Sequence, residues 1–259
     1  MATSVLLTGA AGRVGSAILG GLGQKYDWQL LDREPPPTGR EDEVTYSDHE
    51  YSVADLSDRA AVREAMAGVD VVIHLAGDPR PEAPWDSVLA NNIDGAHTIY
   101  ELAIETGVEK VVFASSNHVV GHYETSRTPE IYRTADSYRL DGSELPRPSN
   151  RYGVSKATGE ILGRFFHDEH DLSVICVRIG NLTKDHPPID YERGQAMWLS
   201  YRDCAHLFDC TITADVGFEI VYGISDNDRK FYSLDRARER LGYSPKDNSA
   251  DFAEVEPPQ

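Results

Sequence analysis

A tyrosine and a lysine in the second half of the sequence have the types and spacing of a proton-transfer site. Tyr152 and Lys156 are four residues apart, so both lie on one face if the segment is helical. A phenol with a pKa of about 10 is a weak base at neutral pH, and a nearby ammonium lowers that pKa by favouring the phenolate. The pair Ser115-Ser116 precedes them and can hydrogen-bond a reacting oxygen. This set predicts a general base for an alcohol or carbonyl substrate.

The N-terminal segment has the pattern of a dinucleotide-binding loop. Gly9, Gly12 and Gly15 lie between a predicted strand, Ser4–Thr8, and a predicted helix, Gly12–Leu22. Small residues are needed there because backbone amides must approach a pyrophosphate at the helix N-terminus. A tight strand-to-helix turn with no ligand is the alternative.

An acidic residue at the end of the second predicted strand bears on cofactor choice. Asp32 can accept hydrogen bonds from the ribose hydroxyls and repel a 2′-phosphate, so the expected cofactor is NAD rather than NADP. Arg33 beside it would soften that preference. Further residues expected to line the cofactor are Arg13, Val14, Asp55, Leu56, Leu75, Ala76, Gly77, Asn92, Tyr152 and Lys156.

Apolar runs alternate with helical patterns along most of the chain. Near-continuous apolar strands separated by helices predict a parallel sheet covered on both faces, which is a doubly wound α/β Rossmann architecture. We expect residues 1–180 to form the NAD-binding domain and residues 181–259 a small substrate-binding cap, some of whose strands and helices return to the Rossmann core. The expected strands are Trp28–Leu31, Tyr51–Asp55, Val69–Leu75, Lys110–Ala114, Leu172–Ile179 and Phe218–Gly223, and the expected helices are Asp58–Ala67 with Ser57 as N-cap, Trp85–Gly107, Arg151–His170, Tyr201–Thr211 and Leu234–Leu241.

Three segments lack this alternation. The stretch from Glu34 to Asp48 is polar and rich in proline, and Tyr123–Asn150 holds three prolines and many charges. Both are expected to be surface loops, and loops as long as the second are often functional. Asp247–Gln259 is expected to be a polar tail.

The composition excludes some partners. The chain has 43 acidic and 25 basic residues and a net charge of −18, and such a surface repels nucleic acid and anionic lipid. Only six of the basic residues are lysines. A surplus of acids with scarce lysine indicates adaptation to a salt-rich cytoplasm, where a Debye length of about 3 Å at 1 M salt screens self-repulsion. An ordinary acidic enzyme is the alternative.

Other sequence features bear on location and on metals. There is no apolar run of membrane-spanning length and no room for a signal peptide before the first strand. Three cysteines without a CxxC spacing fit a reducing cytoplasm. The run His167-Asp168-Glu169-His170 has metal-binding residue types, but it falls at a polar helix end, and no metal is expected.

Together these motifs resemble the extended short-chain dehydrogenase/reductase family over nearly the whole chain. Residues 8–15 are similar to its glycine motif and residues 152–156 to its active-site motif. By the same resemblance Ser116 is the catalytic serine, and Asn92 supports the active-site lysine through water. The helices 85–107 and 151–170 resemble the family's dimer-forming pair, which implies a homodimer or an assembly of dimers.

Within that family the chain resembles two groups of sugar dehydrogenases. Residues 113–118 and 177–180 are similar to enzymes that oxidise hexuronates at C1. Residues 77–85, 145–150 and 191–198 are similar to NAD-dependent enzymes of haloarchaea that oxidise glucose 6-phosphate. The resemblance implies oxidation of glucose 6-phosphate to 6-phosphogluconolactone, with hexuronate oxidation as the alternative.

The implied roles are specific. Tyr152 takes the hydroxyl proton, Lys156 orients the ribose and holds the phenolate, and Ser116 hydrogen-bonds the reacting oxygen. Arg193 is the first candidate to hold the anion at C6, ahead of Arg80 and Arg147. The remaining residues expected to contact substrate are Ser116, Asn117, His118, Tyr152 and Asn181.

Two other classes of function fit the sequence less well. A sugar-nucleotide epimerase or dehydratase is disfavoured because Ser116-Asn117-His118 replaces the small residues common there, and because the C-terminal part is short for a nucleotide-sugar. A regulator that binds NAD without turnover is disfavoured because the chain keeps both Tyr152 and Lys156.

Overall fold

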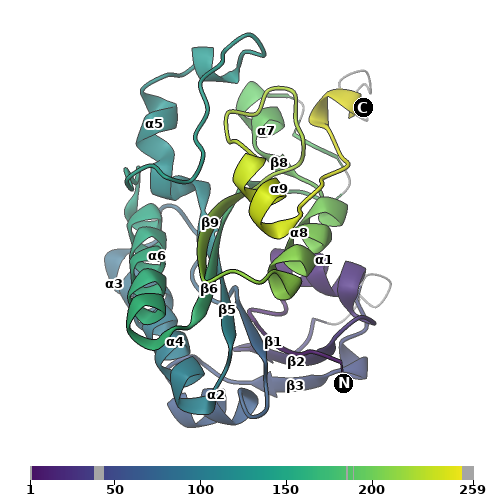
Figure 1. Ribbon diagram of the computed structural model, residues 1–259, viewed down its shortest axis with the longest axis vertical. Coiled ribbons are helices and arrows are strands. Elements are labelled where there is room, and N and C mark those ends of the chain that lie inside the picture. Colours follow the sequence, from purple (N-terminus) through teal and green to yellow (C-terminus); the bar gives the residue numbers. More distant parts are fainter. Residues whose placement is uncertain (1, 38–43, 185, 189, 253–259) are drawn as a thin grey trace.

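A seven-stranded parallel sheet runs through the molecule (Figure 1). The computed structural model describes residues 2–37, 44–184, 186–188 and 190–252. The strand order is β3-β2-β1-β4-β5-β6-β9, so the direction of winding reverses between β1 and β4, where a crevice forms at the carboxyl ends of the strands. This confirms the Rossmann prediction. The strands are β1 Ser4–Thr8, β2 Asp27–Asp32, β3 Glu50–Val53, β4 Val71–His74, β5 Lys110–Ser116, β6 Ser173–Ile179 and β9 Phe218–Gly223.

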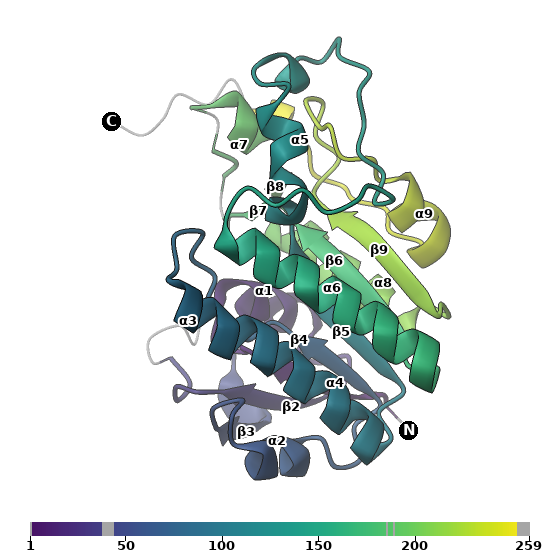
Figure 2. The ribbon, with the colours of Figure 1, turned by 90° about the vertical axis from the view of Figure 1, so that its left-hand side faces the viewer.

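Helices cover both faces of the sheet. Figure 2 shows α4 and α6 side by side across one face, with α2 below them, and α1 and α8 behind the sheet. The layers follow from the sequence, because each crossover between parallel strands carries a helix over one face. The helices are α1 Arg13–Leu22, α2 Arg59–Ala65, α4 Gly95–Thr106, α6 Arg151–His170 and α8 Tyr201–Thr213.

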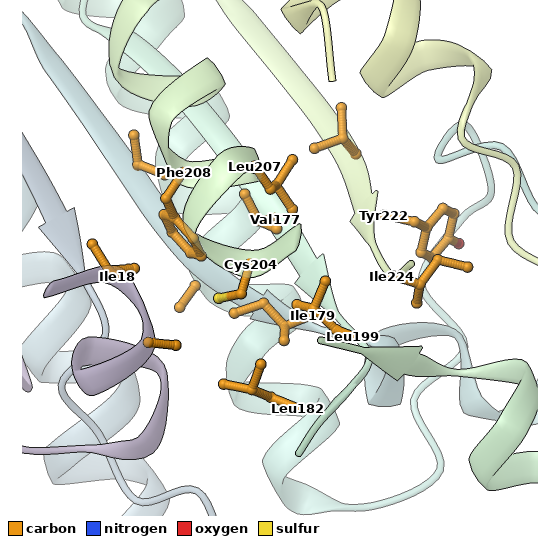
Figure 3. Packing of buried hydrophobic residues seen from close by; sticks show 14 of the residues in the cluster. Ile18, Val177, Ile179, Leu182, Leu199, Cys204, Leu207, Phe208, Tyr222 and Ile224 are labelled. Atoms are coloured by element: carbon orange, nitrogen blue, oxygen red, sulfur yellow. The ribbon is translucent and has the colours of Figure 1, made fainter. Parts of the chain in front are cut away.

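Two apolar clusters lie on opposite faces of the sheet. Successive strand residues point to opposite faces, so Val112 of β5 joins one cluster and Phe113 the other. On the α8 face, Leu207 and Phe208 approach Val177 of β6 (Figure 3). Strands buried on both faces explain why their sequences read as apolar runs rather than as alternating patterns.

The part of the chain after residue 180 contributes to two regions. β9 pairs with β6 and α8 packs on α1, so both belong to the main layers. The other elements lie beyond the strand ends, in the upper part of Figure 1. They are the short strand pair β7 Asn181–Leu182 and β8 Trp198–Leu199, with α7 Glu192–Ala196 and α9 Asp235–Leu241.

The segment after β5 is more ordered than the expected surface loop. It forms a 3₁₀ turn at Asn117–Val120, the short helix α5 at Gly121–Thr125 and another 3₁₀ turn at Glu130–Tyr132. Leu140 is buried because it exchanges backbone hydrogen bonds with the 231–233 segment. That partner lies far along the chain, so the local sequence pattern could not predict this contact.

Several element boundaries differ from expectation. The N-cap of α2 is Asp58, whose carboxylate accepts from the Ala61 N–H, and not Ser57. The expected helix 85–107 is divided into α3 Trp85–Val88, a π-helical stretch Leu89–Asp94 and α4.

The other expected loop and the tail are only partly described. Residues 44–48 of the 34–48 loop include a 3₁₀ turn at Tyr46–Asp48, and residues 38–43 lie outside the described chain. The expected tail begins in contact with the body, because Asp247 accepts a 2.5 Å hydrogen bond from Ser200 Oγ. Residues 253–259 lie outside the described chain. None of the described helices combines the length and apolar character needed to cross a membrane.

Candidate active site

A cavity of ≈ 800 Å³ lies over the carboxyl ends of the strands. It brings together residues from the first glycine turn, from the ends of β2, β4 and β5, and from the start of α6. Of the residues predicted to contact the cofactor, those in its lining are Gly9, Gly12, Arg13, Val14, Gly15, Asp32, Asp55, Leu56, Leu75, Ala76, Gly77, Tyr152 and Lys156.

The glycine turn accepts no side chains at two of its positions. Gly9 has φ +72°, and a Cβ there would lie 2.7 Å from the Ala76 nitrogen. A Cβ on Gly15 would lie 2.4 Å from the Ala10 carbonyl oxygen. Only glycine therefore fits this tightly packed turn, and the turn brings the backbone at the start of α1 into the lining of the cavity, which suits the pyrophosphate of a dinucleotide.

Asp32 lies where the sequence predicted, at the end of β2 and in the lining of the cavity. Its Oδ2 accepts a 3.0 Å hydrogen bond from the Ala11 N–H, and its Oδ1 accepts from the Glu34 N–H at 3.3 Å. The carboxylate thus braces the glycine turn. Each oxygen keeps a further lone pair for a ribose hydroxyl.

Asp55 lines the same cavity at the end of β3. Hydrogen bonds from the Ser57 side chain and backbone hold the pKa of the Asp55 carboxyl below its usual value. The group therefore stays anionic at the edge of the crevice. Arg33 lines the crevice as well.

Tyr152 and Lys156 lie in the first two turns of α6, and both line the cavity. Lys156 Nζ is 5.7 Å from the centroid of the Tyr152 ring. Burial lowers the pKa of Lys156 to about 8. Burial also raises the pKa of Tyr152, and the polar contact with the Ser116 hydroxyl offsets only part of that rise. The expected lowering of the tyrosine pKa is therefore wrong in direction, because burial desolvates the phenolate and disfavours it.

The two adjacent serines serve different partners. Ser116 Oγ accepts from the His118 N–H and donates to Asn117 Oδ1, both at 3.2 Å. Ser115 Oγ instead donates to Glu160 Oε1 of α6 at 2.5 Å. Consecutive strand residues point to opposite faces, so only one of the pair can face Tyr152.

Glu160 is the centre of a buried ionic network. Its two oxygens accept from Arg178 Nε and Nη2 of β6, each at 2.9 Å, and both side chains are at most 3% exposed. Arg178 Nη1 also donates to the Tyr222 hydroxyl of β9 at 3.2 Å. One carboxylate therefore joins the catalytic helix to β5 and β6, and through Arg178 to β9. The sequence contained a signal for this pair, since an arginine inside an apolar strand requires a buried partner.

A second cavity of ≈ 490 Å³ shares Asn117 and His118 with the first. Arg193 of α7 lies in its wall and donates from Nε to Glu124 Oε1 of α5 at 2.6 Å. The Tyr132 hydroxyl donates to the same carboxylate at 2.5 Å. The other lining residues are Gly121, Thr125, Thr128 and Ser149. Glu124 and Tyr132 were not foreseen, because nothing in the local sequence around α5 indicates that it faces α7.

The other residues predicted to contact substrate do not lie together in one cavity. Asn181 lines the larger cavity. Arg80 lines it too, but its guanidinium is paired with Asp78 at 2.6 Å. Arg147 lies outside the lining of both cavities and stacks over the Tyr123 ring at 4.8 Å. Of the three arginines, only Arg193 lies in the smaller cavity.

Asn92 is buried behind the cavity rather than in its wall. Its Oδ1 accepts from the Asp78 N–H at 2.6 Å, and its Nδ2 donates to Ser155 Oγ at 2.9 Å. Asn92 therefore links the turn after β4 to α6 at Ser155, the residue before Lys156.

Two side chains of the 167–170 run make contacts with other groups of the chain. His167 Nδ1 lies 2.9 Å from the Leu172 carbonyl, and Asp168 accepts from Arg164. Within the described part of the chain, no group of three or more His, Cys, Asp or Glu side chains is arranged to hold a metal ion.

Comparison with known proteins places this site in a family. Residues 5–197 match the NAD dependent epimerase/dehydratase family. Because the match covers more than half of the chain, the chain belongs to this family.

Three relatives are informative. The NAD-dependent glucose-6-phosphate dehydrogenase of Haloferax volcanii is 67% identical over 96% of this chain and 95% of its own length. The L-arabinose 1-dehydrogenase (NAD(P)(+)) of the same organism is 38% identical over 96% of this chain and 99% of its own length. The crystal structure of the glucuronic acid dehydrogenase of Chromohalobacter salexigens superposes with a TM-score of 0.82 at 33% identity, covering 98% of this chain and 88% of that one.

Loss of the buried Glu160 charge should destabilise the protein strongly. Glu160→Gln leaves the buried Arg178 with only its longer ion pair to Glu144, at 3.6 Å, and breaking a buried pair costs about 3–5 kcal/mol of unfolding free energy. Denaturant unfolding at fixed salt measures the change. The matched control is Glu101→Gln, which removes an exposed pair with Arg59 and should cost about 0–1 kcal/mol. Equal losses in the two variants would contradict the assigned role of Glu160.

Proposed function

We propose that the protein is an NAD-dependent sugar dehydrogenase that oxidises glucose 6-phosphate at C1 to 6-phosphogluconolactone, the entry step of the pentose phosphate pathway. The observation that carries this proposal is that the two cavities share Asn117 and His118 in their linings. A cofactor crevice beside a smaller cavity with an arginine in its wall suits a monosaccharide with an anionic end. The sugar substrates of the similar enzymes support the same assignment.

Bound NAD supplies the hydride acceptor of this reaction. The glycine turn would hold its pyrophosphate, and Asp32 the adenosine ribose. Tyr152 would take the proton of the C1 hydroxyl, and Ser116 would hydrogen-bond the same oxygen. Lys156 lies beside the Tyr152 ring, where its ammonium stabilises the phenolate at the moment the proton moves.

Arg193 is the residue we assign to the anion at C6. Glu124 holds the Nε edge of its guanidinium, and Nη1 makes no hydrogen bond to the residues that the structure describes. The free edge can donate to a phosphate oxygen. A hexuronate also carries an anion at C6, so hexuronate oxidation is the second candidate, supported by the likeness to the glucuronic acid dehydrogenase fold.

Removal of Arg193 should weaken glucose 6-phosphate selectively. Losing a charge-assisted contact of about 1.5–3 kcal/mol raises KM by about 10–150-fold if the grip is equal in ground and transition states. Steady-state kinetics of Arg193→Ala with glucose 6-phosphate and with free glucose measure the selectivity. Arg147→Ala, which changes an arginine outside both cavities, is the matched control.

A second variant tests the Arg193 assignment by an expected change of KM in the opposite direction. Glu124→Gln keeps a hydrogen-bonding side chain beside Arg193 but removes the negative charge, so KM for glucose 6-phosphate should fall while free glucose is unaffected. If Arg193→Ala slows both sugars equally, Arg193 does not hold the phosphate.

The Tyr152 pKa predicts a pH dependence. Because burial holds that pKa above its ordinary value, kcat/KM should rise as the pH is raised from about 6 to about 8, where the phenolate fraction grows while Lys156 keeps much of its charge. Tyr152→Phe should remove this slope and lower kcat by about 10²–10⁴-fold with NAD affinity nearly intact. A variant that keeps more than about a tenth of kcat would exclude Tyr152 as the base.

We also propose a homodimer, or an assembly of dimers, built on α6 and its neighbours. Ile161 and Phe165 of α6 are 64% and 52% exposed, and Trp85 and Leu89 on the adjacent segment are also exposed. Ile161→Asp combined with Phe165→Asp should give a monomer by light scattering. Val53→Asp, at an exposed apolar residue on the edge strand β3, should leave the mass unchanged. A double variant with the parent mass would refute this interface.

The composition supports work in a salt-rich cytoplasm. With 43 acidic against 25 basic residues, self-repulsion destabilises the compact state unless salt screens it. Thermal melts from low to molar KCl should therefore show a rising melting temperature, with activity rising in parallel. A melting temperature that stays constant or falls as KCl is added would contradict salt adaptation and favour an ordinary acidic enzyme.

A further inference from the structure

The hydrogen bonds around His118 determine which of its ring nitrogens carries the proton. Asn150 is the N-cap of α6, and its Oδ1 accepts from the Gly153 N–H at 2.7 Å. The amide orientation is therefore set, because a backbone N–H requires an oxygen opposite it. The Asn150 Nδ2 group then lies 2.9 Å from His118 Nδ1. Two donors cannot share one contact, so Nδ1 must be the acceptor and the proton resides on Nε2.

The cap and the histidine are held together by close packing. A Cβ on Gly153 would lie 2.4 Å from the His118 carbonyl oxygen, so the first turn of α6 presses on the backbone of His118. The His118 ring meets the Tyr152 ring edge-on, with centroids 5.8 Å apart. The backbone of His118 is therefore fixed against α6, and the Tyr152 ring lies beside the imidazole.

The surrounding charges also favour the neutral ring. Burial and the Arg193 guanidinium of α7 lower the pKa of His118, and the Glu124 carboxylate of α5 acts in the opposite direction. The third facing titratable group is Tyr152 of α6. His118 Nε2 makes no hydrogen bond within the described part of the chain, and the residue lines both cavities.

We propose that Asn150 is a positioning residue that holds His118 as the Nε2–H tautomer, so that the imidazole is a fixed hydrogen-bond donor to a sugar oxygen. The opposite tautomer would present a lone pair, which can accept from a hydroxyl but repels the ring and carbonyl oxygens of a lactone. The same side chain thus begins the catalytic helix and sets the polarity of the substrate cavity. The inference rests on the proposed function only for the identity of the sugar.

Asn150→Asp tests this directly, because it keeps a helix-capping oxygen and reverses the polarity at Nδ1. The carboxylate accepts from Nδ1–H, so the tautomer should switch and the His118 pKa should rise. Long-range ¹H–¹⁵N NMR in KCl, without substrate, reads the tautomer, and His118→Gln assigns the signals. A wild-type spectrum with the proton on Nδ1, or averaged between the nitrogens, would overturn the proposal.

Kinetics with glucose 6-phosphate provide a second readout. Asn150→Asp should raise KM by about tenfold at alkaline pH, with a smaller effect on kcat. The penalty should shrink as the pH falls through the raised His118 pKa, because the imidazolium carries a proton on both nitrogens. A purely structural role would give a penalty that is independent of pH.

Two further variants separate capping from polarity. Asn150→Ser keeps a capping oxygen, but its shorter side chain places no polar atom at the position of Nδ2 and brings no charge, so its penalty should be smaller and independent of pH. In the His118→Gln background, Asn150→Asp should add no pH-dependent penalty. A wild type that leaves glucose 6-phosphate unoxidised would refute the proposed function, while the NMR result would still decide the tautomer.

Discussion

The geometry of the site depends on one buried carboxylate. The carboxylate of Glu160 in α6 accepts hydrogen bonds from the Ser115 hydroxyl of β5 and from Nε and Nη2 of Arg178 in β6. Tyr152 and Lys156 lie on the same helix, and Ser116 follows Ser115 on the strand. A buried ion pair with satisfied hydrogen bonds is a specific link rather than a strong source of stability, because desolvation offsets much of its attraction. The pair fixes the position of α6 relative to the ends of β5 and β6.

The site built around α6 and the end of β5 contains two cavities. The crevice over the sheet extends from the glycine turn to the start of α6, and it shares Asn117 and His118 with the smaller cavity. Arg193 and Glu124 place a balanced charge pair at the far wall. An anion that binds there meets a guanidinium already held in position, so little side-chain entropy is lost on binding.

Local sequence patterns predicted the sheet, its helices and the Tyr152/Lys156 pair, because apolar runs and an i, i+4 spacing are local properties. The Glu124–Arg193 pair was not predictable, since α5 and α7 are short polar helices that meet only through loop packing. The pKa shift of Tyr152 was predicted in the wrong direction, because burial is a property of the assembled site. Arg80 and Arg147 were chosen on charge alone, and neither reaches the smaller cavity.

The proposed reaction of this site is the oxidation of glucose 6-phosphate with NAD. The most direct measurement is kcat/KM for glucose 6-phosphate and for glucuronate, each followed by NADH formation in molar KCl, with NADP in place of NAD as the cofactor comparison. We expect the higher kcat/KM with glucose 6-phosphate and NAD, and 6-phosphogluconate as the product after hydrolysis of the lactone. A higher kcat/KM with glucuronate, or no NADH from glucose 6-phosphate, would contradict it.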